Sequence, residues 1–216
     1  MRTPHDIKRV AVLGAGLMGH GIALELAAHR RLVCLHDVSE QLLDTAIAHA
    51  RVGLKALHQA GLISFDEIEA SISRISTSLN LSETVEGTDL VIEAVSENLE
   101  LKHSLFDKVD RIAPAHAVLV SNTSTFLPSA LAAATQRPLQ FAGVHYYNPP
   151  HLLPGVEIIK GPETSDATVQ LLTGFYQMIG KRPALIYKEI QGFIGNRLQV
   201  ALLREAMSII RDGHAT

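Results

Sequence analysis

The stretch "RVAVLGAGLMGHGIALELAA", residues 9–28, decides the fold class of this chain. Its first six residues are mostly apolar and rich in Val and Leu, as a buried strand requires. Gly14, Gly16 and Gly19 follow with GxGxxG spacing, and a helical pattern begins at residue 18. An isolated GxGxxG is a weak signal, but a preceding strand and a following helix are the context that makes it specific. The stretch therefore predicts a dinucleotide-binding βαβ unit.

Each of the three glycines has its own role in holding a pyrophosphate. Gly14 permits the tight turn, Gly16 lets the backbone approach the phosphates, and Gly19 allows the helix to pack closely on the strand. The helix N-terminus attracts the anion. Leu17 and Met18 lie at that end and complete the predicted cofactor-binding turn.

Asp37 ends the second predicted strand, roughly 20 residues after Gly14, as the fingerprint requires. A carboxylate at this position hydrogen-bonds the adenosine ribose hydroxyls of NAD and repels the additional phosphate of NADP. NAD is therefore the predicted cofactor, with FAD as an alternative because its fingerprint is similar. A cap on the helix that follows is the competing interpretation of Asp37.

Composition excludes several other classes of protein. With 19 basic and 22 acidic residues, a net charge of -3 and no long basic run, the 216-residue chain has no electrostatic footprint for nucleic acid. Its single cysteine, Cys34, excludes a disulfide framework or a thiolate metal cluster and fits a cytoplasmic location. The 11 histidines show no metal-ligand spacing, and the apolar runs are too short to span a membrane.

Short apolar runs alternate with longer helical patterns along the chain. This alternation predicts an α/β fold of the Rossmann type, with right-handed crossovers and a doubly wound, mostly parallel sheet. The predicted strands are residues 9–14, 32–37, 89–95, 117–122, 141–147, 155–160 and 183–188. The predicted helices are residues 18–29, 40–60, 98–112, 128–135 and 165–179.

The segment 39–81 is longer than one crossover helix needs. Its pattern predicts a helix that ends at Gly61 and a second helix capped by Ser64, with Glu67 at capping-box spacing. The two helices form a hairpin inserted into the sheet topology. The hairpin is either a solvated excursion or a flap that faces the substrate.

Five further motifs, in order, carry a resemblance to a known family: "VIEAVSENLELKHSLF", "SNTSTF", "GVHYYNPP", "VEII" and "GFIGNR". Together they resemble the 3-hydroxyacyl-CoA dehydrogenases, from about Lys8 to the last residue. The resemblance implies an NAD-binding domain over residues 1–189. It also implies that residues 190–216 are the connecting helix and start of an all-α C-terminal domain, of which this chain holds only a part. In that family the helical domain completes the active site and forms a homodimer.

The same resemblance implies roles for four catalytic residues. His145 of "HYYNP" is the expected acid/base, and imidazole titrates in the range that this role needs. Glu157 of "VEII" orients and supports the imidazolium. Ser124 and Asn196 contact the substrate oxygen, although for Ser124 an ordinary turn residue is the alternative.

The resemblance also places three residues near the cofactor. Asn148 helps to position His145 or the nicotinamide region, and Glu97 and Lys102 of "SENLELK" match family positions beside NAD. Alternatives are a local turn for Asn148, which precedes two prolines, and a solvated helix face for Glu97 and Lys102.

A register argument pairs the two central residues independently of the family. If residues 141–147 and 155–160 are neighbouring antiparallel strands, a register centred on His151 places residue 145 opposite residue 157. The predicted pair is then a consequence of one hairpin.

Departures from the family pattern lie on the substrate side. The loop "PPHLLPGVE" carries Pro150 and Pro154, Gly155 stands at a usual Leu, and Gln191 at a usual Pro. The prolines resemble relatives that oxidise small free 3-hydroxy acids of the gulonate, carnitine or pyridine-carboxylate type. The predicted substrate is a 3-hydroxyacyl-CoA, with a free 3-hydroxy acid as the alternative. A non-catalytic NAD-binding protein is a third interpretation.

The last predicted helix carries an apolar stripe that the rest of the chain has little left to cover. We therefore expect a partner chain or a further domain to pack on it. The stripe consists of Ile194, Leu198, Leu202, Met207 and Ile210.

Overall fold

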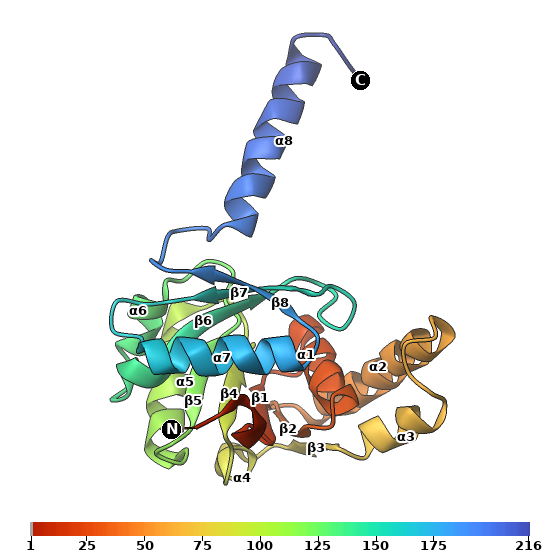
Figure 1. The fold of residues 1–216 in the computed structure, drawn as a ribbon, viewed down its shortest axis with the longest axis vertical. Helices are drawn as coiled ribbons and strands as arrows, with labels where there is room; N and C mark the ends of the chain where they lie inside the picture. The colour runs from red at the N-terminus through yellow and green to blue at the C-terminus, as the bar shows by residue number, and fades with distance from the viewer. Residues whose placement is uncertain (1) are drawn as a thin grey trace.

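The computed structural model describes residues 2–216 and is built around one eight-stranded sheet (Figure 1). The strand order β3-β2-β1-β4-β5-β6-β7-β8 contains the 3-2-1-4-5-6 order of dinucleotide-binding folds. The strands are β1 Arg9–Leu13, β2 Leu32–His36, β3 Ile75–Ser78, β4 Leu90–Glu93, β5 Val118–Ser121, β6 Phe141–Tyr146, β7 Gly155–Ile159 and β8 Arg182–Ile186.

The sheet is mostly parallel, as predicted. The pairings from β3 through β6 are all parallel, β7 runs antiparallel to β6, and β8 is parallel to β7. The four central strands β1, β4, β5 and β6 are buried almost throughout, which explains why they read as continuous apolar runs. Their carboxyl ends meet at one edge of the sheet, where the predicted site residues gather.

Helices cover both faces of the sheet, which makes the fold doubly wound. One apolar cluster joins the sheet to α1, α2, α3 and α7, and a second joins the other face to α4, α5 and α6. The helices in these two layers are α1 Leu17–Ala28, α2 Glu40–Gln59, α3 Asp66–Ile72, α4 Leu81–Val85, α5 Leu99–Ile112, α6 Pro128–Ala132 and α7 Asp166–Met178.

The predicted hairpin between β2 and β3 is present as α2 and α3, which extend past the edge of the sheet (Figure 1). Gly61 ends α2 with φ +73°, a conformation that glycine adopts without strain. The predicted cap of α3 is wrong: Phe65 is the N-cap, and only the Glu67 half of the capping box forms, by accepting the Ser64 amide at 3.3 Å. Phe65 itself has αR backbone angles, and no side chain makes a cap hydrogen bond at the N-terminus of α3.

The short elements that escaped the sequence prediction include β3 and α4. The four residues of β3 include two exposed ones at the sheet edge, so the strand lacks the apolar run that marks a central strand. The five residues of α4 are too few to show helical periodicity.

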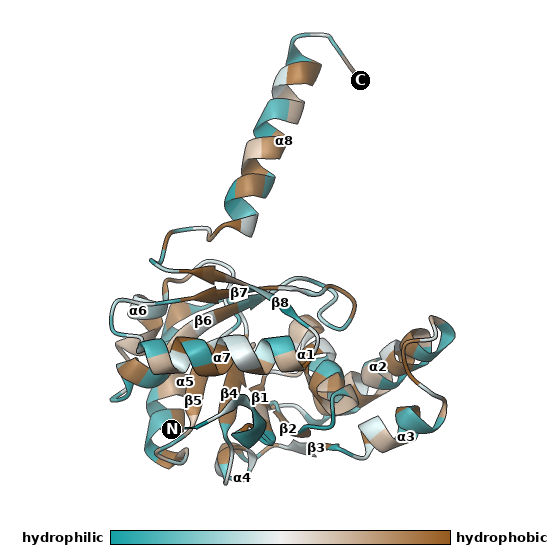
Figure 2. Ribbon diagram, viewed as in Figure 1, coloured by the Kyte–Doolittle hydropathy of each residue, from teal (hydrophilic) through white to brown (hydrophobic). Residues whose placement is uncertain are grey.

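The helix α8, Gly195–Arg211, projects away from the body of the protein (Figure 1). It contains no buried residue. Apolar and polar residues nevertheless alternate along it, as they do in a helix with one face packed on a core (Figure 2). The predicted stripe is exposed: Ile194 is 44% exposed, Leu198 60%, Leu202 73%, Met207 63% and Ile210 53%. Within residues 2–216, no helix combines the length and apolar character that a membrane crossing needs.

Candidate functional site

The glycine turn after β1 has the close approaches that its sequence predicts. Gly14 has φ +104°, and a side chain there would place its Cβ 2.6 Å from the Ala94 carbonyl oxygen. A Cβ on Gly19 would collide with the Gly14 carbonyl, so α1 packs directly against the turn. Gly16, the N-cap of α1, instead has open space where a Cβ would lie. That space at a helix N-terminus fits a pyrophosphate.

Asp37 is tied to this turn rather than to the helix that follows it. Its Oδ2 accepts the Ala15 amide at 2.8 Å, and its Oδ1 accepts the Val38 amide at 2.7 Å. The N-cap of α2 is Ser39, whose hydroxyl accepts the Leu42 amide, so the alternative of a helix cap for Asp37 is wrong. The carboxylate is left at the edge of the groove, where a ribose can reach it.

A groove of about 700 Å³ runs along the carboxyl ends of β1, β2 and β4 and has the residue types that NAD binding requires. Gly14, Gly16, Leu17 and Met18 form one end, beside Asp37. The other end reaches Glu97, Lys102 and Ser124. The groove therefore brings together the predicted cofactor-binding residues of three segments, while Gly19 lies beneath them.

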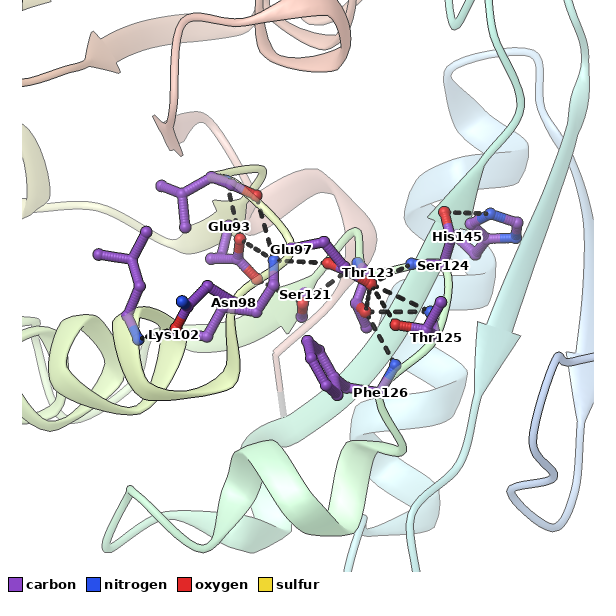
Figure 3. Close-up of polar contacts among 12 residues, drawn as sticks. Glu93, Glu97, Asn98, Lys102, Ser121, Thr123, Ser124, Thr125, Phe126 and His145 are labelled. Carbon is purple, nitrogen blue, oxygen red and sulfur yellow. Dashed lines mark hydrogen bonds and ion pairs between the residues drawn. The ribbon is translucent and has the colours of Figure 1, made fainter.

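Glu97 organises the loop "SNTSTF" that follows β5 (Figure 3). Its Oε1 accepts the backbone amides of Ser124 and Thr125, each at 3.1 Å. The hydroxyls of Thr123 and Thr125 donate to the same oxygen. Burial alone would raise the pKa of Glu97, but these hydroxyls and Lys102 outweigh it and hold the pKa below its usual value. Glu97 stays ionised and fixes the loop.

Lys102 lies beside Glu97, fully buried, and is not part of a solvated helix face. Its Nζ contacts Glu93 Oε1 at 2.5 Å and Glu97 Oε2 at 3.2 Å, and it donates to the Val95 carbonyl at 3.2 Å. Burial raises the pKa of Glu93, and Lys102 acts against that rise. Because a lone buried charge is costly, Lys102 needs both carboxylates, and it links the end of β4 to the loop after β5.

His145 and Glu157 face each other in the antiparallel pairing of β6 and β7, in the predicted register. The distance from His145 Nδ1 to Glu157 Oε2 is 2.7 Å, and both side chains are almost fully buried. Glu157 Oε1 accepts the amides of Ile194 and Gly195 at 2.9 Å. Burial would raise the pKa of Glu157, but His145 and these amides lower it below its usual value.

The other imidazole nitrogen faces the loop after β5. His145 Nε2 lies 3.2 Å from Ser124 Oγ, and Asn196 Nδ2 donates to the Ser124 carbonyl at 3.1 Å. A carboxylate accepts hydrogen bonds only, so Nδ1 carries the proton toward Glu157 and Nε2 is left to exchange one. His145, Glu157, Ser124 and Asn196 thus form one connected group.

A second cavity, of about 540 Å³, opens beside this group. His145, Ser124, Asn196 and Asn148 line it, together with Leu198 and other residues of the first turns of α8. Asn148 therefore lies on the His145 side. Met18, Asn122 and Ser124 line both this cavity and the NAD-sized groove, so the two spaces meet at Ser124. A small molecule in the cavity would therefore lie beside a dinucleotide bound in the groove.

Sequence reasoning missed Asn122, although it lies inside the quoted motif "SNTSTF". Its Oδ1 accepts the Tyr146 amide at 3.0 Å and so ties the end of β5 to β6. The signal that could have identified it is its position as a polar residue at the end of an apolar strand. Across residues 2–216, no three His, Cys, Asp or Glu side chains gather closely enough to hold a metal ion.

The chain is similar to proteins of known name over nearly its whole length. The family model described as 3-hydroxyacyl-CoA dehydrogenase, NAD binding domain, matches residues 9–190. Mitochondrial hydroxyacyl-coenzyme A dehydrogenase of Sus scrofa is 39% identical over 219 residues, covering 97% of this chain and 68% of that protein. (S)-3-Hydroxybutyryl-CoA dehydrogenase PaaH1 from Ralstonia eutropha matches with a TM-score of 0.91 and 31% identity, over 97% of this chain and 74% of that one.

A third similarity concerns a protein named for a different substrate. An NAD⁺-dependent dismutase, 5-formyl-3-hydroxy-2-methylpyridine 4-carboxylic acid 5-dehydrogenase, matches with a TM-score of 0.88 and 31% identity. The match covers 97% of this chain and 67% of that one. Proteins that share this fold are thus named for a CoA thioester in one case and for a free carboxylic acid in another.

Proposed function

Because the chain belongs to the 3-hydroxyacyl-CoA dehydrogenase family, we propose that its residues His145 and Glu157 move the proton in the reaction of that family. The enzyme is an NAD-dependent oxidoreductase that interconverts a 3-hydroxyacyl-CoA and a 3-oxoacyl-CoA. The single observation that carries the residue assignment is the 2.7 Å contact between His145 Nδ1 and Glu157 Oε2 beside the cavity.

In the oxidation direction, His145 Nε2 takes the proton of the substrate 3-hydroxyl, and in the reduction direction it returns it. Glu157 holds Nδ1–H and stabilises the imidazolium that forms, as carboxylates do in other His-based sites. Ser124 Oγ, 3.2 Å from Nε2, holds the reacting oxygen near that nitrogen. Asn196 fixes the Ser124 loop from the start of α8 and faces the same cavity.

NAD, when bound, accepts or supplies the hydride at the substrate carbon. Gly14, Gly16, Leu17 and Met18 would hold the pyrophosphate at the start of α1, and Asp37 would hold the adenosine ribose. Met18, Asn122 and Ser124, where the groove meets the cavity, would hold the reactive end of the cofactor against the substrate. Asn148 contributes from the His145 side. Glu97 and Lys102 act beneath the cofactor by fixing the loop that presents Ser124.

A free 3-hydroxy acid is the alternative substrate class. Two observations favour it: the prolines of "PPHLLPG", which resemble those of relatives that oxidise small free acids, and the similarity to a dehydrogenase named for a pyridine carboxylic acid. In this alternative the proton transfer by His145 is unchanged, and only the binding of the rest of the substrate differs.

We further propose that residues 1–189 are the NAD-binding domain, that residues 190–216 connect to a helical domain, and that the protein acts as a homodimer through that region. The exposed apolar stripe of α8 supports a covering partner. A cytoplasmic location is proposed from the single cysteine. The mitochondrial name of the Sus scrofa relative makes that organelle the alternative, and fractionation of the host cell distinguishes them.

The test of function follows NADH oxidation by absorbance with full-length protein. Acetoacetyl-CoA, free acetoacetate and other 3-oxo acids are offered at equal concentration. Turnover with the thioester alone supports the acyl-CoA assignment. Turnover with free acids alone moves the protein to the alternative, and no turnover with any of them contradicts both.

A further inference from the structure

Gln191 stands at the position of a usual proline, in the linker that joins β8 to α8. Its side-chain Nε2 donates to the Thr125 carbonyl at 2.9 Å, although 66 positions separate the two residues. A proline side chain has no donor and could not make this hydrogen bond. The departure from the family pattern therefore adds a contact between the linker and the loop "SNTSTF".

Three side chains from the linker and the start of α8 hold backbone groups of the segment 124–129. The pairs are Glu189 with the Ser129 amide at 2.9 Å, Gln191 with the Thr125 carbonyl at 2.9 Å and Asn196 with the Ser124 carbonyl at 3.1 Å. The linker is itself fixed, since Phe193 is fully buried in a small apolar cluster with Ile159 and Ile186. Gln191 thus reaches the loop from a fixed base.

The peptide unit between Ser124 and Thr125 is held at both ends. Glu97 accepts its N–H at 3.1 Å, and Asn196 donates to its carbonyl at 3.1 Å. Because a peptide unit is planar, hydrogen bonds to its N–H and its carbonyl together fix its orientation. Glu97 also accepts the Ser124 amide at 3.1 Å, so the backbone on both sides of the Ser124 Cα is held.

The next peptide unit, between Thr125 and Phe126, is held in the same way. Thr123 Oγ1 accepts its N–H at 3.0 Å, and Gln191 donates to its carbonyl at 2.9 Å. The two units share the Cα of Thr125, so a rotation of the second unit disturbs the first, which carries Ser124. Gln191 therefore gives the second unit the contact that the first receives from α8.

We propose that Gln191 is a positioning residue for Ser124, acting through the Thr125 carbonyl. This inference rests on the proposed function, in which the Ser124 hydroxyl holds the reacting oxygen near His145 Nε2. Gln191 is exposed, so its contribution is that of one hydrogen bond in contact with water. It acts on the loop from the side opposite to Glu97, and its loss leaves Ser124 less narrowly held.

Gln191→Met in the full-length enzyme removes the donor and keeps a side chain of similar length. The matched control is Gln59→Met, at the exposed end of α2. We expect kcat of Gln191→Met to fall by about threefold to tenfold with little change in KM, the effect of one lost hydrogen bond on the placement of a reacting group. Gln191→Glu should lose more, because an ionised carboxylate has no proton to donate to a carbonyl.

The outcomes separate this inference from the function on which it rests. Unchanged kcat in Gln191→Met beside an active wild type would overturn the inference and leave the function intact. An inactive wild type would count against the proposed function, and the inference is then decided by the exchange measurement described below.

A double-variant comparison shows whether Gln191 acts through Ser124. In a Ser124→Ala background the hydroxyl that Gln191 positions is gone, so adding Gln191→Met should change kcat by less than about twofold. A merely structural role of Gln191 would persist in this background. A full threefold to tenfold loss there, by the same measure as above, would overturn the inference.

Hydrogen exchange tests the contact without activity. The amides of residues 122–127 should exchange faster in Gln191→Met than in wild type, because the Thr125 carbonyl has lost its partner. Exchange in β6 should stay unchanged, and Gln59→Met should resemble wild type throughout. Equal rates for residues 122–127 in Gln191→Met and wild type would contradict the proposal. Faster exchange along the whole chain would also contradict it, since that marks a general loss of stability.

Discussion

Glu97 Oε1 and the backbone amide of Ser124 are joined by a 3.1 Å hydrogen bond, although 27 positions separate the two residues. Ser124 is exposed at the end of a loop, yet it must stay within reach of His145 Nε2. Glu97 adds contacts to the hydrogen bonds within the loop, because it also accepts from Thr123 and Thr125. The placement of one hydroxyl that lines the cavity thus depends on a carboxylate directly before another helix.

Glu97→Ala should lower kcat by about tenfold to a hundredfold, since a displacement of about 1 Å at a reacting group has that effect. Glu97→Gln, which keeps one acceptor oxygen, should lose less. Steady-state kinetics with acetoacetyl-CoA and NADH measures both. Glu100→Ala, on the exposed side of α5, is the control, and equal losses in Glu97→Ala and Glu100→Ala would refute the role of Glu97.

His145→Ala should reduce turnover by at least about a hundredfold, because it removes the group that exchanges the proton. NADH binding, followed by fluorescence, should change little, since His145 lines the substrate cavity and not the cofactor groove. His214→Ala near the exposed end of the chain is the control. Retained turnover would remove His145 from the acid/base role.

Asp37→Asn should weaken NADH binding by about tenfold or more, the effect of losing charged hydrogen bonds to a ribose. The preference for NADH over NADPH should also fall, because the repulsion of the additional phosphate is gone. Titration of both nucleotides measures this, with the exposed Asp44→Asn as the control. A variant that keeps both the affinity and the preference would contradict the ribose assignment.

The buried pair of Glu25 and Lys181 should set part of the pH dependence of stability. Lys181 Nζ contacts Glu25 Oε1 at 2.5 Å and donates to the carbonyls of Pro150 and Leu153 in the loop after Asn148. Burial raises the pKa of Glu25 from 4.5 to about 7, against the pull of Lys181. A folded pKa above the unfolded one means that stability falls as pH rises between these two values.

Glu25→Gln should therefore show a smaller loss of stability than wild type between about pH 5 and pH 7 in urea unfolding. Lys181→Met should destabilise the fold by about 3 kcal/mol or more, because it leaves a buried carboxylate without its partner. Lys108→Met on the exposed face of α5 is the control. An equal pH slope in Glu25→Gln and wild type would show that Glu25 does not titrate in this range.

Much of the fold was predictable because its signals are local. The glycine turn is recognisable from the sequence of one strand and the helix that follows it. The register of residues 145 and 157 follows from the length of a single hairpin. The edge strand β3 was not predictable, since two of its four residues face solvent and no apolar run marks it.

Long-range contacts account for the rest of what the sequence did not reveal. Nothing near Lys102 indicates that it is buried against the end of β4, because Glu93 lies on another element. Gly155 was visible as a departure from the family pattern, although an added Cβ there would make only ordinary van der Waals contact with the ring of Tyr147. The glycine that Tyr147 does need is Gly195, 48 positions further along the chain, so no local pattern connects the two.

The start of α8 holds Glu157 through two amides, while the rest of this 17-residue helix touches no core. A helix of that length is a stiff rod of about 25 Å. A tilt of this rod would withdraw two donors from Glu157 together. In the proposed mechanism, proton transfer at His145 would therefore respond to contacts that the outer end of α8 makes far from the cavity.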